Sequence, residues 1–301
     1  MNTVEVFSQA KINLFLAITG RRADGFHDLV SVAAQLQWGD GLKVEIRKAE
    51  SGNDAKGDFT LDCDDPGVPR GDTNTILRAA RAFRTATGWN VGAGFTLEKR
   101  VPMGAGLGGG SGNAVAALRA LNRLSGGLLG GPALAAIAAE IGSDCALFLE
   151  EGPVVIRGRG ERVAALPGAA AARLRGRRVL VFKPGFSIPT KWAYGRLAEE
   201  AAYQPAAGAE EWVAAWLEGD APAEELLANG MEQAAFAKFP ALPVLLDRLR
   251  SDFGIGARMS GSGSACFALL PESGPPAVSE VAAVVRSAWG PSALVVETRL
   301  A

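Results

Sequence analysis

Histidine and cysteine are scarce in this sequence of 301 residues, which contains one histidine and three cysteines. The cysteines, Cys63, Cys145 and Cys266, are odd in number and lie far apart, so the sequence has neither a disulfide framework nor zinc-ligand spacing. Nothing in the spacing around His27, the single histidine, suggests a metal site. This cysteine usage is typical of a reducing compartment, and we expect a cytoplasmic protein.

An excess of charge of one sign is also absent, because 31 Lys and Arg residues face 32 Asp and Glu residues. A net charge of −1 provides no electrostatic footprint for nucleic acid or for an anionic membrane. The longest uncharged runs, at 101–118 and 124–139, are broken by glycine and proline, so neither is a credible membrane span. The first twenty residues lack the basic start and the cleavage site of a signal peptide. We therefore expect neither a nucleic-acid partner nor a membrane.

The hydrophobic pattern predicts an α+β protein. Strands are predicted where β-branched and large apolar residues gather, at 11–19, 30–38, 42–47, 94–101, 179–185 and 292–299, with a strand pair near 146–158. The segment 257–270 is predicted as a second glycine–serine loop that leads into a strand. Helices are predicted where apolar residues follow helical spacing, at 72–83, 113–124, 132–141, 189–252 in several pieces, and 276–288. Asp72 or Thr73 is the expected cap of the first helix. We expect two domains, 1–155 and 156–301, with a cleft between them.

The most informative stretch is VPMGAGLGGGSGNAVAAL, at 101–118, in which six of the nine residues from Gly104 to Gly112 are glycine. Glycine loses the most conformational freedom on folding, so this density indicates that something approaches the backbone closely. Glycine-rich loops that open a helix commonly bind phosphates. No lysine follows the glycines, which excludes a P-loop, and a dinucleotide fingerprint is disfavoured by the preceding Pro102 and the lack of an acid in 120–131. A flexible loop or a tight helix-packing site is the alternative without a ligand.

Two motifs resemble those of the GHMP kinases, the superfamily of galactokinase, homoserine kinase, mevalonate kinase and phosphomevalonate kinase. PMGAGLGGGSGNA (102–114) resembles their nucleotide loop, and MSGSGSACFALL (259–270) resembles their C-terminal glycine loop. AKINLFLAITGRRADGFHDLVSV (10–32) is similar to the opening of one member family, the 4-diphosphocytidyl-2-C-methyl-D-erythritol kinases. That similarity extends over almost the whole chain. Phe26, where tyrosine is usual, and Cys145-Ala146, in place of Val-Pro, depart from the pattern.

This resemblance implies a two-lobed GHMP kinase fold, with an N-terminal lobe like ribosomal protein S5, a C-terminal α/β lobe and the active site in the cleft. It implies ATP-dependent phosphorylation of the 2-hydroxyl of 4-diphosphocytidyl-2-C-methyl-D-erythritol, in the non-mevalonate isoprenoid pathway, with Mg²⁺. The ATP triphosphate would then lie against the glycines of 104–110. The partner would be a small molecule, and we expect a monomer or a weak homodimer.

The resemblance also assigns roles to residues. Asp144 and Lys11 are the expected catalytic pair, in which Asp144 accepts or orients the acceptor hydroxyl and Lys11 stabilises negative charge. The expected ATP-binding residues are Pro102, Met103, Gly104, Ala105, Gly106, Leu107, Gly108, Gly109, Gly110, Ser111, Asn74 and Lys99. The expected substrate-binding residues are Asn13, Phe26, His27, Thr190, Tyr194, Gly261 and Gly263. Among the latter, Phe26 and Tyr194 would sandwich cytosine while His27 contacts its edge. Ser111 is also the candidate Mg²⁺ ligand.

Each role has an ordinary structural alternative. Asp144 follows a predicted helix and precedes the strand-like ALFL of 146–149, where a turn aspartate is common; Lys11 suits an edge strand. Ser111 suits the cap of the following helix, and the aromatic residues suit core packing. For the whole chain, the alternatives are another GHMP kinase, of the homoserine or mevalonate kinase type, and a non-catalytic S5-like module that binds RNA. The DGFH segment disfavours the first and the neutral charge disfavours the second.

Overall fold

The computed structural model describes residues 2–47 and 58–301. The chain forms two compact units, which we call unit 1 and unit 2. Unit 1 comprises Met1–Ala10, Gly39–Met103 and Gly108–Leu149; unit 2 comprises Lys11–Trp38, Gly104–Leu107 and Glu150–Ala301. Each unit is built from segments that are separated in the sequence, whereas the expected boundary near 155 is a single cut. The division into domains 1–155 and 156–301 stays a prediction.

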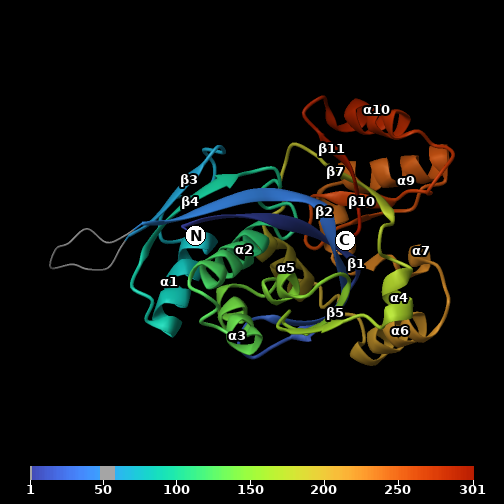
Figure 1. The fold of residues 1–301 in the computed structure, drawn as a ribbon. Coiled ribbons are helices and arrows are strands. Elements are labelled where there is room, and N and C mark those ends of the chain that lie inside the picture. Colours follow the sequence, from blue (N-terminus) through green and yellow to red (C-terminus); the bar gives the residue numbers. More distant parts are fainter. Residues whose placement is uncertain (1, 48–57) are drawn as a thin grey trace. The chain divides into compact units, whose positions relative to one another are not determined.

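Unit 1 pairs short strands with the ends of two long ones (Figure 1). Strand β3 (Phe59–Cys63) runs parallel to β4 (Gly92–Glu98), and β4 runs antiparallel to 41–47, the end of β2 (His27–Arg47). Helix α1 (Thr75–Thr87) packs on α2 (Gly109–Leu124), and both contact α3 (Gly131–Ile141). The apolar face predicted for α1 is confirmed, because all its members are buried: Ile76, Leu77, Ala80 and Phe83.

Strand β2 corrects the prediction of two separate strands at 30–38 and 42–47, because it continues through Gly39, Asp40 and Gly41. Gly39 and Gly41 indicated a turn between two strands, but glycine at position 39 is needed for another reason. A Cβ atom at Gly39 would lie 2.1 Å from the backbone oxygen of Ser8 on β1 (Thr3–Arg21). Glycine here permits a close approach between neighbouring backbones within a continuous strand.

Two further predictions about unit 1 are wrong. The residues Ala146–Leu149, expected as a strand, form the 3₁₀ helix η1. The cap of α1 is Asn74 rather than Asp72 or Thr73, since the Asn74 side chain accepts a hydrogen bond from the N–H of Ile76 at 2.8 Å. Helix α2 also begins four residues before the predicted start at 113, inside the glycine run. Glycines at the first turn of α2 therefore belong to the helix that the loop opens.

Unit 2 contains a four-stranded antiparallel sheet in the order β11 (Leu294–Arg299), β7 (Arg178–Lys183), β10 (Cys266–Leu269) and β9 (Ala257–Met259). The remaining strands attach to the long N-terminal ones: β5 (Val154–Gly158) pairs with 29–33 of β2 and with β6 (Arg162–Ala165), and β8 (Ala228–Asn229) runs parallel to β1 at Phe15–Leu16. The helices of unit 2 are α4 (Gly168–Ala172), α5 (Thr190–Glu199), α6 (Ala206–Glu218), α7 (Ala223–Leu226), α8 (Glu232–Lys238), α9 (Ala241–Phe253) and α10 (Val278–Trp289).

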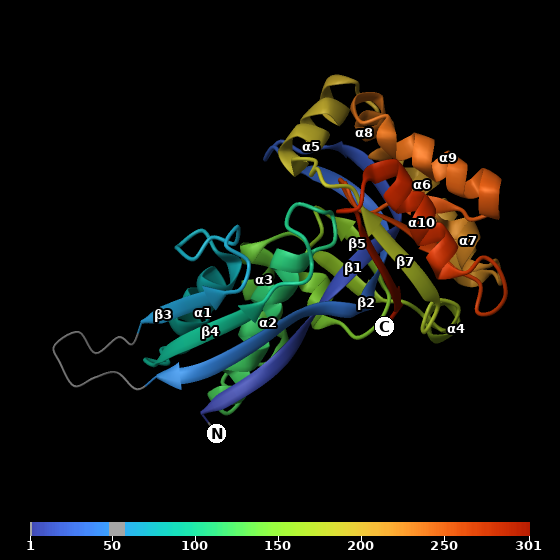
Figure 2. The same ribbon diagram turned by 90° about the horizontal axis from the view of Figure 1, so that it is seen from above.

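One hydrophobic cluster holds the C-terminal part of unit 2 together. Helices α9 and α10 lie side by side (Figure 2) and contribute Leu245, Leu249 and Val285 to the cluster, to which Phe182 of β7 also belongs. Leu16 and Ile18 of β1 belong to the same cluster. Burying each such side chain contributes roughly 1.5–3 kcal/mol relative to exposure. The cluster thus fixes the two ends of the second glycine loop, which joins β9 to β10.

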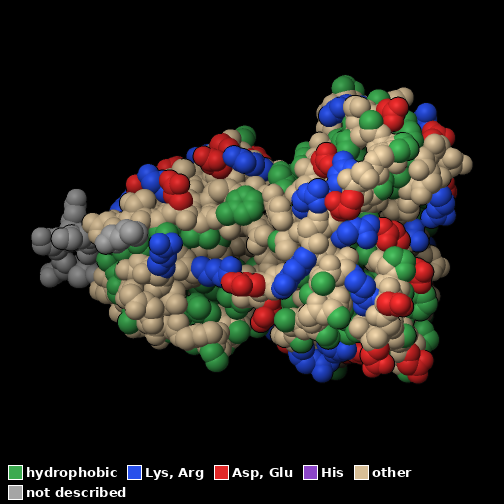
Figure 3. Space-filling view, turned by 45° about the vertical axis from the view of Figure 1, so that its right-hand side comes forward, with side chains coloured by type: hydrophobic (Ala, Val, Ile, Leu, Met, Phe, Trp, Pro, Cys, Tyr) green, Lys and Arg blue, Asp and Glu red, His purple; other side chains and the backbone are tan. Residues whose placement is uncertain are grey.

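The outer face shown in Figure 3 carries Lys and Arg side chains interspersed with Asp and Glu, in keeping with the net charge of −1. Among the helices that the structure describes, in 2–47 and 58–301, none combines the length and the apolar character that a bilayer crossing requires.

Candidate functional site

The glycine loop between β4 and α2 needs glycine for its backbone shape. Gly104, Gly106 and Gly108 have φ angles of 61°, 77° and 69°, a left-handed conformation that side chains with a Cβ atom rarely adopt. Between them, the side chains of Ala105 and Leu107 are buried. The loop therefore alternates buried anchors with left-handed glycines and delivers the chain to the first turn of α2 at Gly109.

Within unit 2, the chain itself approaches the loop. A Cβ atom at Gly106 would lie 2.1 Å from the carbonyl oxygen of Ser260, in the second glycine loop. The backbone of Ala265 donates to the oxygen of Ala105 at 3.1 Å, and the backbone of Lys11 donates to the oxygen of Leu107 at 2.9 Å. The close contact that the sequence indicated at Gly106 is therefore made by protein backbone, and the contact of Gly106 with ATP stays a prediction.

Within unit 1, the start of α2 is open. A Cβ atom at Gly110 would have Thr75 Oγ1, at 3.7 Å, as its nearest neighbour. The first backbone N–H of α2 with an acceptor is that of Gly112, which donates to the oxygen of Gly108 at 2.9 Å. In the described part of the chain, the N–H groups of Gly109, Gly110 and Ser111 have no acceptor. Such a helix start attracts anions, because its N–H groups carry a partial positive charge.

A buried ion pair lies beside this helix start. The Lys99 ammonium donates to Asp40 Oδ2, and the side chains of the two residues are 5% and 0% exposed. A Cβ atom at Gly109 would lie 3.0 Å from Lys99 Nζ, so the positive charge is next to the first residue of α2. Asp40 also accepts from the backbone N–H groups of Arg100 and Val101, at 2.7 and 2.8 Å, and from Asn113 Nδ2 at 2.9 Å. Asp40 thus positions both the Lys99 ammonium and the backbone of Arg100 and Val101, through which the chain enters the loop.

Lys11 and Asn13 share one face of β1. Lys11 is 3% exposed, and its ammonium donates to Asn13 Oδ1 at 2.6 Å. The Asn13 amide group donates to Ser31 Oγ at 2.9 Å, and its backbone N–H donates to Ser260 Oγ at 3.3 Å. Ser260 Oγ in turn donates to the oxygen of Gly106 at 3.0 Å. In unit 2 the structure therefore brings Lys11, Asn13 and the two glycine loops together.

Asp144 lies in unit 1, in the turn that joins α3 to η1, and is half-buried. Burial raises the pKa of the neighbouring Cys145 thiol to about 11; the Asp144 charge adds to this rise, and a hydrogen bond with the Ser111 side chain opposes it. Ser111, at the first turn of α2, is thus close to the Asp144–Cys145 turn. The turn of unit 1 that carries Asp144 and the open start of α2 are neighbours.

Asn74 and Thr75 have partners within unit 1. Both ends of the Asn74 side chain are used, since its oxygen caps α1 and its amide group donates to the oxygen of Pro69 at 2.7 Å. Thr75 Oγ1 donates to the oxygen of Gly110 at 2.7 Å, which ties α1 to α2. Asn74 therefore has a structural role, and its contact with adenosine stays a prediction.

The segment RADGFH forms the turn between β1 and β2 in unit 2. His27 and Tyr194 of α5 are brought together, with ring centroids 4.9 Å apart and planes tilted by 39°. Phe26 is 47% exposed, and the Arg159 guanidinium carbon lies 5.1 Å from the centre of its ring. Burial, aided by the charge of Arg21, lowers the pKa of His27, which favours the neutral form of its ring. The sandwich of a base between Phe26 and Tyr194 stays a prediction.

The other substrate positions lie in or beside the second glycine loop. Thr190 Oγ1 is 3.1 Å from Ser262 Oγ. Gly261 and Gly263 have φ angles of 56° and 82°, and a Cβ atom at Gly263 would lie 2.5 Å from Met259 Sδ. The left-handed φ angle of Gly263 therefore favours glycine there without any ligand.

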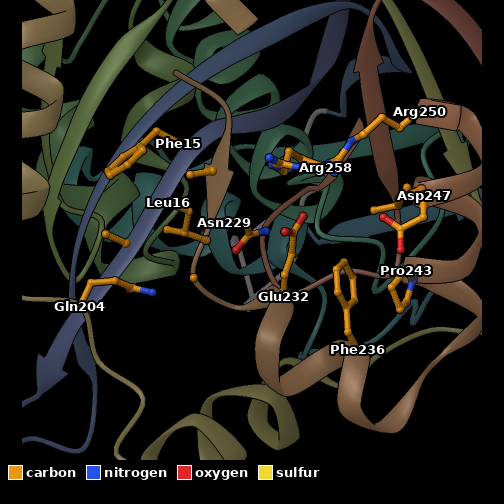
Figure 4. A pocket seen from close by; sticks show the side chains of 14 residues that line it. Phe15, Leu16, Gln204, Asn229, Glu232, Phe236, Pro243, Asp247, Arg250 and Arg258 are labelled. Atoms are coloured by element: carbon orange, nitrogen blue, oxygen red, sulfur yellow. The ribbon is translucent and has the colours of Figure 1, made fainter. Parts of the chain in front are cut away.

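A separate cavity of about 540 Å³ in unit 2 contains none of the predicted site residues. Its lining combines Phe15 and Leu16 of β1 with Phe236 of α8 and Pro243 of α9 (Figure 4). Two arginines and two acids supply its charges: Arg250, Arg258, Glu232 and Asp247. Burial raises the pKa of Glu232, while the backbone N–H of Met259, which donates to it at 2.8 Å, and the two arginines oppose the rise. The opposite charges balance, and nothing in the lining selects one class of ligand.

Sequence reasoning missed Asp40, Ser260 and Tyr203. Asp40 had a signal, an acid between two glycines within an apolar strand pattern. Ser260 lies in the second glycine loop, but the sequence analysis did not assign it a role, and Tyr203 lies in the stretch where the motifs are least distinctive.

In the described residues, no three His, Cys, Asp or Glu side chains are arranged to hold a metal ion. A Mg²⁺ ion here would depend mainly on phosphate oxygens, as Mg²⁺ at nucleotide sites commonly does.

Comparison with known proteins identifies the family of the chain. The family model for the GHMP kinases N terminal domain matches residues 74–152, and that for GHMP kinases C terminal matches 216–289. The 4-diphosphocytidyl-2-C-methyl-D-erythritol kinase of Protochlamydia amoebophila (strain UWE25) is 35% identical over 89% of this chain and 85% of its own length. The enzyme of the same name from Synechococcus sp. (strain CC9311) is 38% identical over 89% and 87%.

Solved structures give the same result. A crystal structure of 4-(cytidine 5'-diphospho)-2C-methyl-D-erythritol kinase matches with a TM-score of 0.75 and 33% identity, over 99% of this chain and 100% of that one. The mevalonate kinase of Methanococcus jannaschii, at 13% identity and a TM-score of 0.69, shares the fold over 99% and 98% of the two chains. The α+β GHMP kinase fold predicted from the motifs is thereby confirmed. The chain belongs to the family of 4-diphosphocytidyl-2-C-methyl-D-erythritol kinases, ATP-dependent phosphotransferases within the GHMP kinases.

Proposed function

We propose that this protein transfers the γ-phosphoryl group of ATP to the 2-hydroxyl of 4-diphosphocytidyl-2-C-methyl-D-erythritol, a step of the non-mevalonate route to isoprenoid precursors. The observation that carries the phosphate side of the proposal is the start of α2. Three backbone N–H groups, at Gly109, Gly110 and Ser111, have no acceptor in the described chain, and the Lys99 ammonium lies next to the first of them, Gly109. Phosphoryl transfer depends mainly on positioning and charge neutralisation, and this arrangement supplies both.

The roles of the chain's residues follow from this chemistry. The N–H groups at 109–111 would hold phosphate oxygens, and Ser111 Oγ would be the protein's ligand for Mg²⁺, which would add charge neutralisation. Asp144 accepts the proton of the acceptor hydroxyl or orients that hydroxyl, and Lys11 stabilises the charge on the transferred group. Asn13 orients Lys11 through the 2.6 Å hydrogen bond and contacts the acceptor. Thr190, Gly261 and Gly263 form the surroundings of the acceptor.

Cytidine recognition is assigned to the cluster around His27. Stacking of a base on an aromatic face contributes roughly 1–3 kcal/mol, and Tyr194 supplies such a face beside His27. This binding energy comes from a part of the substrate that is remote from the reacting hydroxyl. Tyr194→Ala is therefore expected to raise KM for the cytidyl substrate about 5- to 150-fold.

The deciding experiment is a coupled ADP-release assay with ATP, Mg²⁺ and one acceptor at a time. The cytidyl substrate should support turnover, whereas mevalonate and homoserine should not. Turnover with either of the latter alone would favour another GHMP kinase activity, and no turnover with any acceptor would favour a binding module. Asp144→Asn should lower kcat by about 10²–10⁴-fold while ATP affinity stays within a few-fold, and near-normal kcat would remove Asp144 from the chemistry.

The setting of the enzyme is part of the same proposal. A small-molecule kinase that uses ATP works where ATP and reduced thiols are present, and we assign it to the cytoplasm. Its partner is its substrate, with no nucleic acid and no membrane. A monomer or a weak homodimer remains the expected state, and sedimentation at several protein concentrations measures it.

A further inference from the structure

A third aromatic side chain belongs to the cluster around His27. Tyr203 follows α5 in the sequence, and its ring centroid lies 6.0 Å from that of His27. The Tyr203 hydroxyl is 3.5 Å from His27 Nε2, at the long end of hydrogen-bond distance. Tyr194 lies on the same imidazole at 4.9 Å. One imidazole therefore contacts both tyrosines that the sequence contains.

The chain holds Tyr203 in this place through its neighbours. Helix α5 ends in a turn in which Ala201 adopts a φ of 48° and the N–H of Ala202 donates to the oxygen of Leu197 at 3.2 Å. Next to Tyr203, Gln204 makes two hydrogen bonds with Ile18 of β1. Its backbone N–H donates to the Ile18 oxygen at 3.0 Å, and its side-chain oxygen accepts from the Ile18 N–H at 2.9 Å.

Glycine at position 230 leaves the space that Gln204 occupies. A Cβ atom at Gly230 would lie 2.2 Å from Gln204 Nε2, while the backbone of Gly230 donates to the oxygen of Leu16 on β1 at 2.7 Å. Gln204 is one wall of the cavity in Figure 4. The position of the phenol is thus fixed by β1, from which the chain runs through the RADGFH turn to His27.

We propose that Tyr203 is a positioning residue, whose hydroxyl donates to His27 Nε2 and so keeps the imidazole proton on Nδ1. This inference rests on the proposed function in one respect, that His27 contacts the base. A neutral imidazole has one donor and one acceptor nitrogen, and the partner of one nitrogen decides which is which. With Nε2 engaged as acceptor, Nδ1 presents a donor of fixed position to the ligand.

A fixed donor has a consequence for specificity. Position 3 of cytosine is an acceptor, whereas position 3 of uracil is an N–H donor. An Nδ1–H group that faces this edge pairs with cytosine and opposes uracil. Without the phenol hydroxyl, the imidazole exchanges between its two neutral forms and discriminates less.

The first test does not depend on ligand or activity, because His27 is the only histidine in the sequence. Histidine-selective ¹⁵N labelling of tag-free protein gives two ring nitrogens, whose shifts report the tautomer directly. The expected wild-type spectrum has the proton on Nδ1, and Tyr203→Phe should move the population toward Nε2–H. Gln204→Leu retains the phenol but removes one bond to Ile18, and should shift the spectrum the same way by less. A wild-type proton on Nε2, or identical spectra for wild type and Tyr203→Phe, would overturn the proposal.

The second test measures recognition. Tyr203→Phe should lower the ratio of kcat/KM for the cytidyl substrate to that for its uridyl analogue by about 3- to 10-fold, with kcat for the cytidyl substrate unchanged. An unchanged ratio alongside a shifted tautomer would overturn the role in specificity. Absence of turnover with every acceptor, together with the expected spectra, would overturn the proposed function while the hydrogen bond stands.

Discussion

Replacement of Asp40 by asparagine is the sharpest test of how unit 1 shapes the glycine loop. The Asp40 carboxylate is fully buried and accepts four hydrogen bonds, from the Lys99 ammonium, two backbone N–H groups and the Asn113 amide. Asparagine has the same shape, but it has no charge and only one acceptor oxygen. If that oxygen keeps the backbone donors of Arg100 and Val101, the new NH₂ group must face two other donors.

The magnitude follows from the burial of both partners. Removal of one partner from a buried ion pair costs about 3–5 kcal/mol, because the other charge stays buried without compensation. At an m-value of about 3 kcal/mol per M, the urea midpoint should fall by roughly 1 M or more. Lys99→Met should cost less, about 1–3 kcal/mol, since Asp40 would keep three of its four donors. The double variant should cost less than the sum of the two single variants.

Urea unfolding and hydrogen exchange together provide the measurement. Exchange of the Arg100 and Val101 amides should accelerate in Asp40→Asn, because their common acceptor is altered. Asp62→Asn is the matched control, since Asp62 is an exposed carboxylate on neighbouring β3 and its loss should change stability by less than about 0.5 kcal/mol. A midpoint for Asp40→Asn within about 0.2 M of wild type would refute the view that this carboxylate carries the loop entrance.

Three further predictions concern single positions. Gly110→Ala should fold normally and weaken ATP binding, whereas Gly106→Ala should destabilise the fold, because its Cβ atom would lie 2.1 Å from the Ser260 oxygen. Calorimetry measures the ATP affinity of each variant and thermal melts measure its stability. An unstable Gly110→Ala variant would contradict the open helix start. Ala201→Gly should stabilise by about 0.5–1 kcal/mol, since relief of the left-handed φ of 48° outweighs the entropy of glycine, and a lower Tm would count against this. Cys145, with a pKa of about 11 and no exposed surface, should resist iodoacetamide at pH 8 until the protein unfolds, and rapid labelling of the native protein would show otherwise.

The sequence patterns predicted most elements because their signals are local. The apolar spacing of α1 and the β-branched runs of β1 and β7 each refer to residues within one element, and the structure confirms them. The motifs then supplied the fold class, since two glycine loops in a fixed order are more specific than any propensity. Apolar spacing and residue propensity were sufficient to predict an element wherever the residues that determine it lie within that element.

Three predictions failed, and one of the three failures is decided by a distant segment of the chain. Gly39 and Gly41 suggest a turn, but the backbone of β1 passes so close to Gly39 that a strand with glycine is the stable solution. The ALFL segment has strand propensity, yet it forms the 3₁₀ turn η1 after Asp144. Asn74, rather than Asp72 or Thr73, is the N-cap of α1, and its amide group also donates a hydrogen bond to the oxygen of Pro69. The partner of Gly39, on β1, cannot be identified from a window of neighbouring residues, whereas the Pro69 partner of Asn74 is local and was overlooked.

Glycine in the loop has two different roles, internal packing and access for a ligand, and the sequence alone does not distinguish them. At Gly106 and Gly112, a Cβ atom would meet backbone oxygens of the protein, those of Ser260 and Gln9, at 2.1 and 2.8 Å. At Gly110, nothing lies closer than 3.7 Å, and the neighbouring N–H groups have no acceptor in the described chain. Glycine density therefore overstates the share of the loop that a ligand requires. Internal packing fixes the loop at its tight positions, and a phosphate can approach only where the packing leaves room.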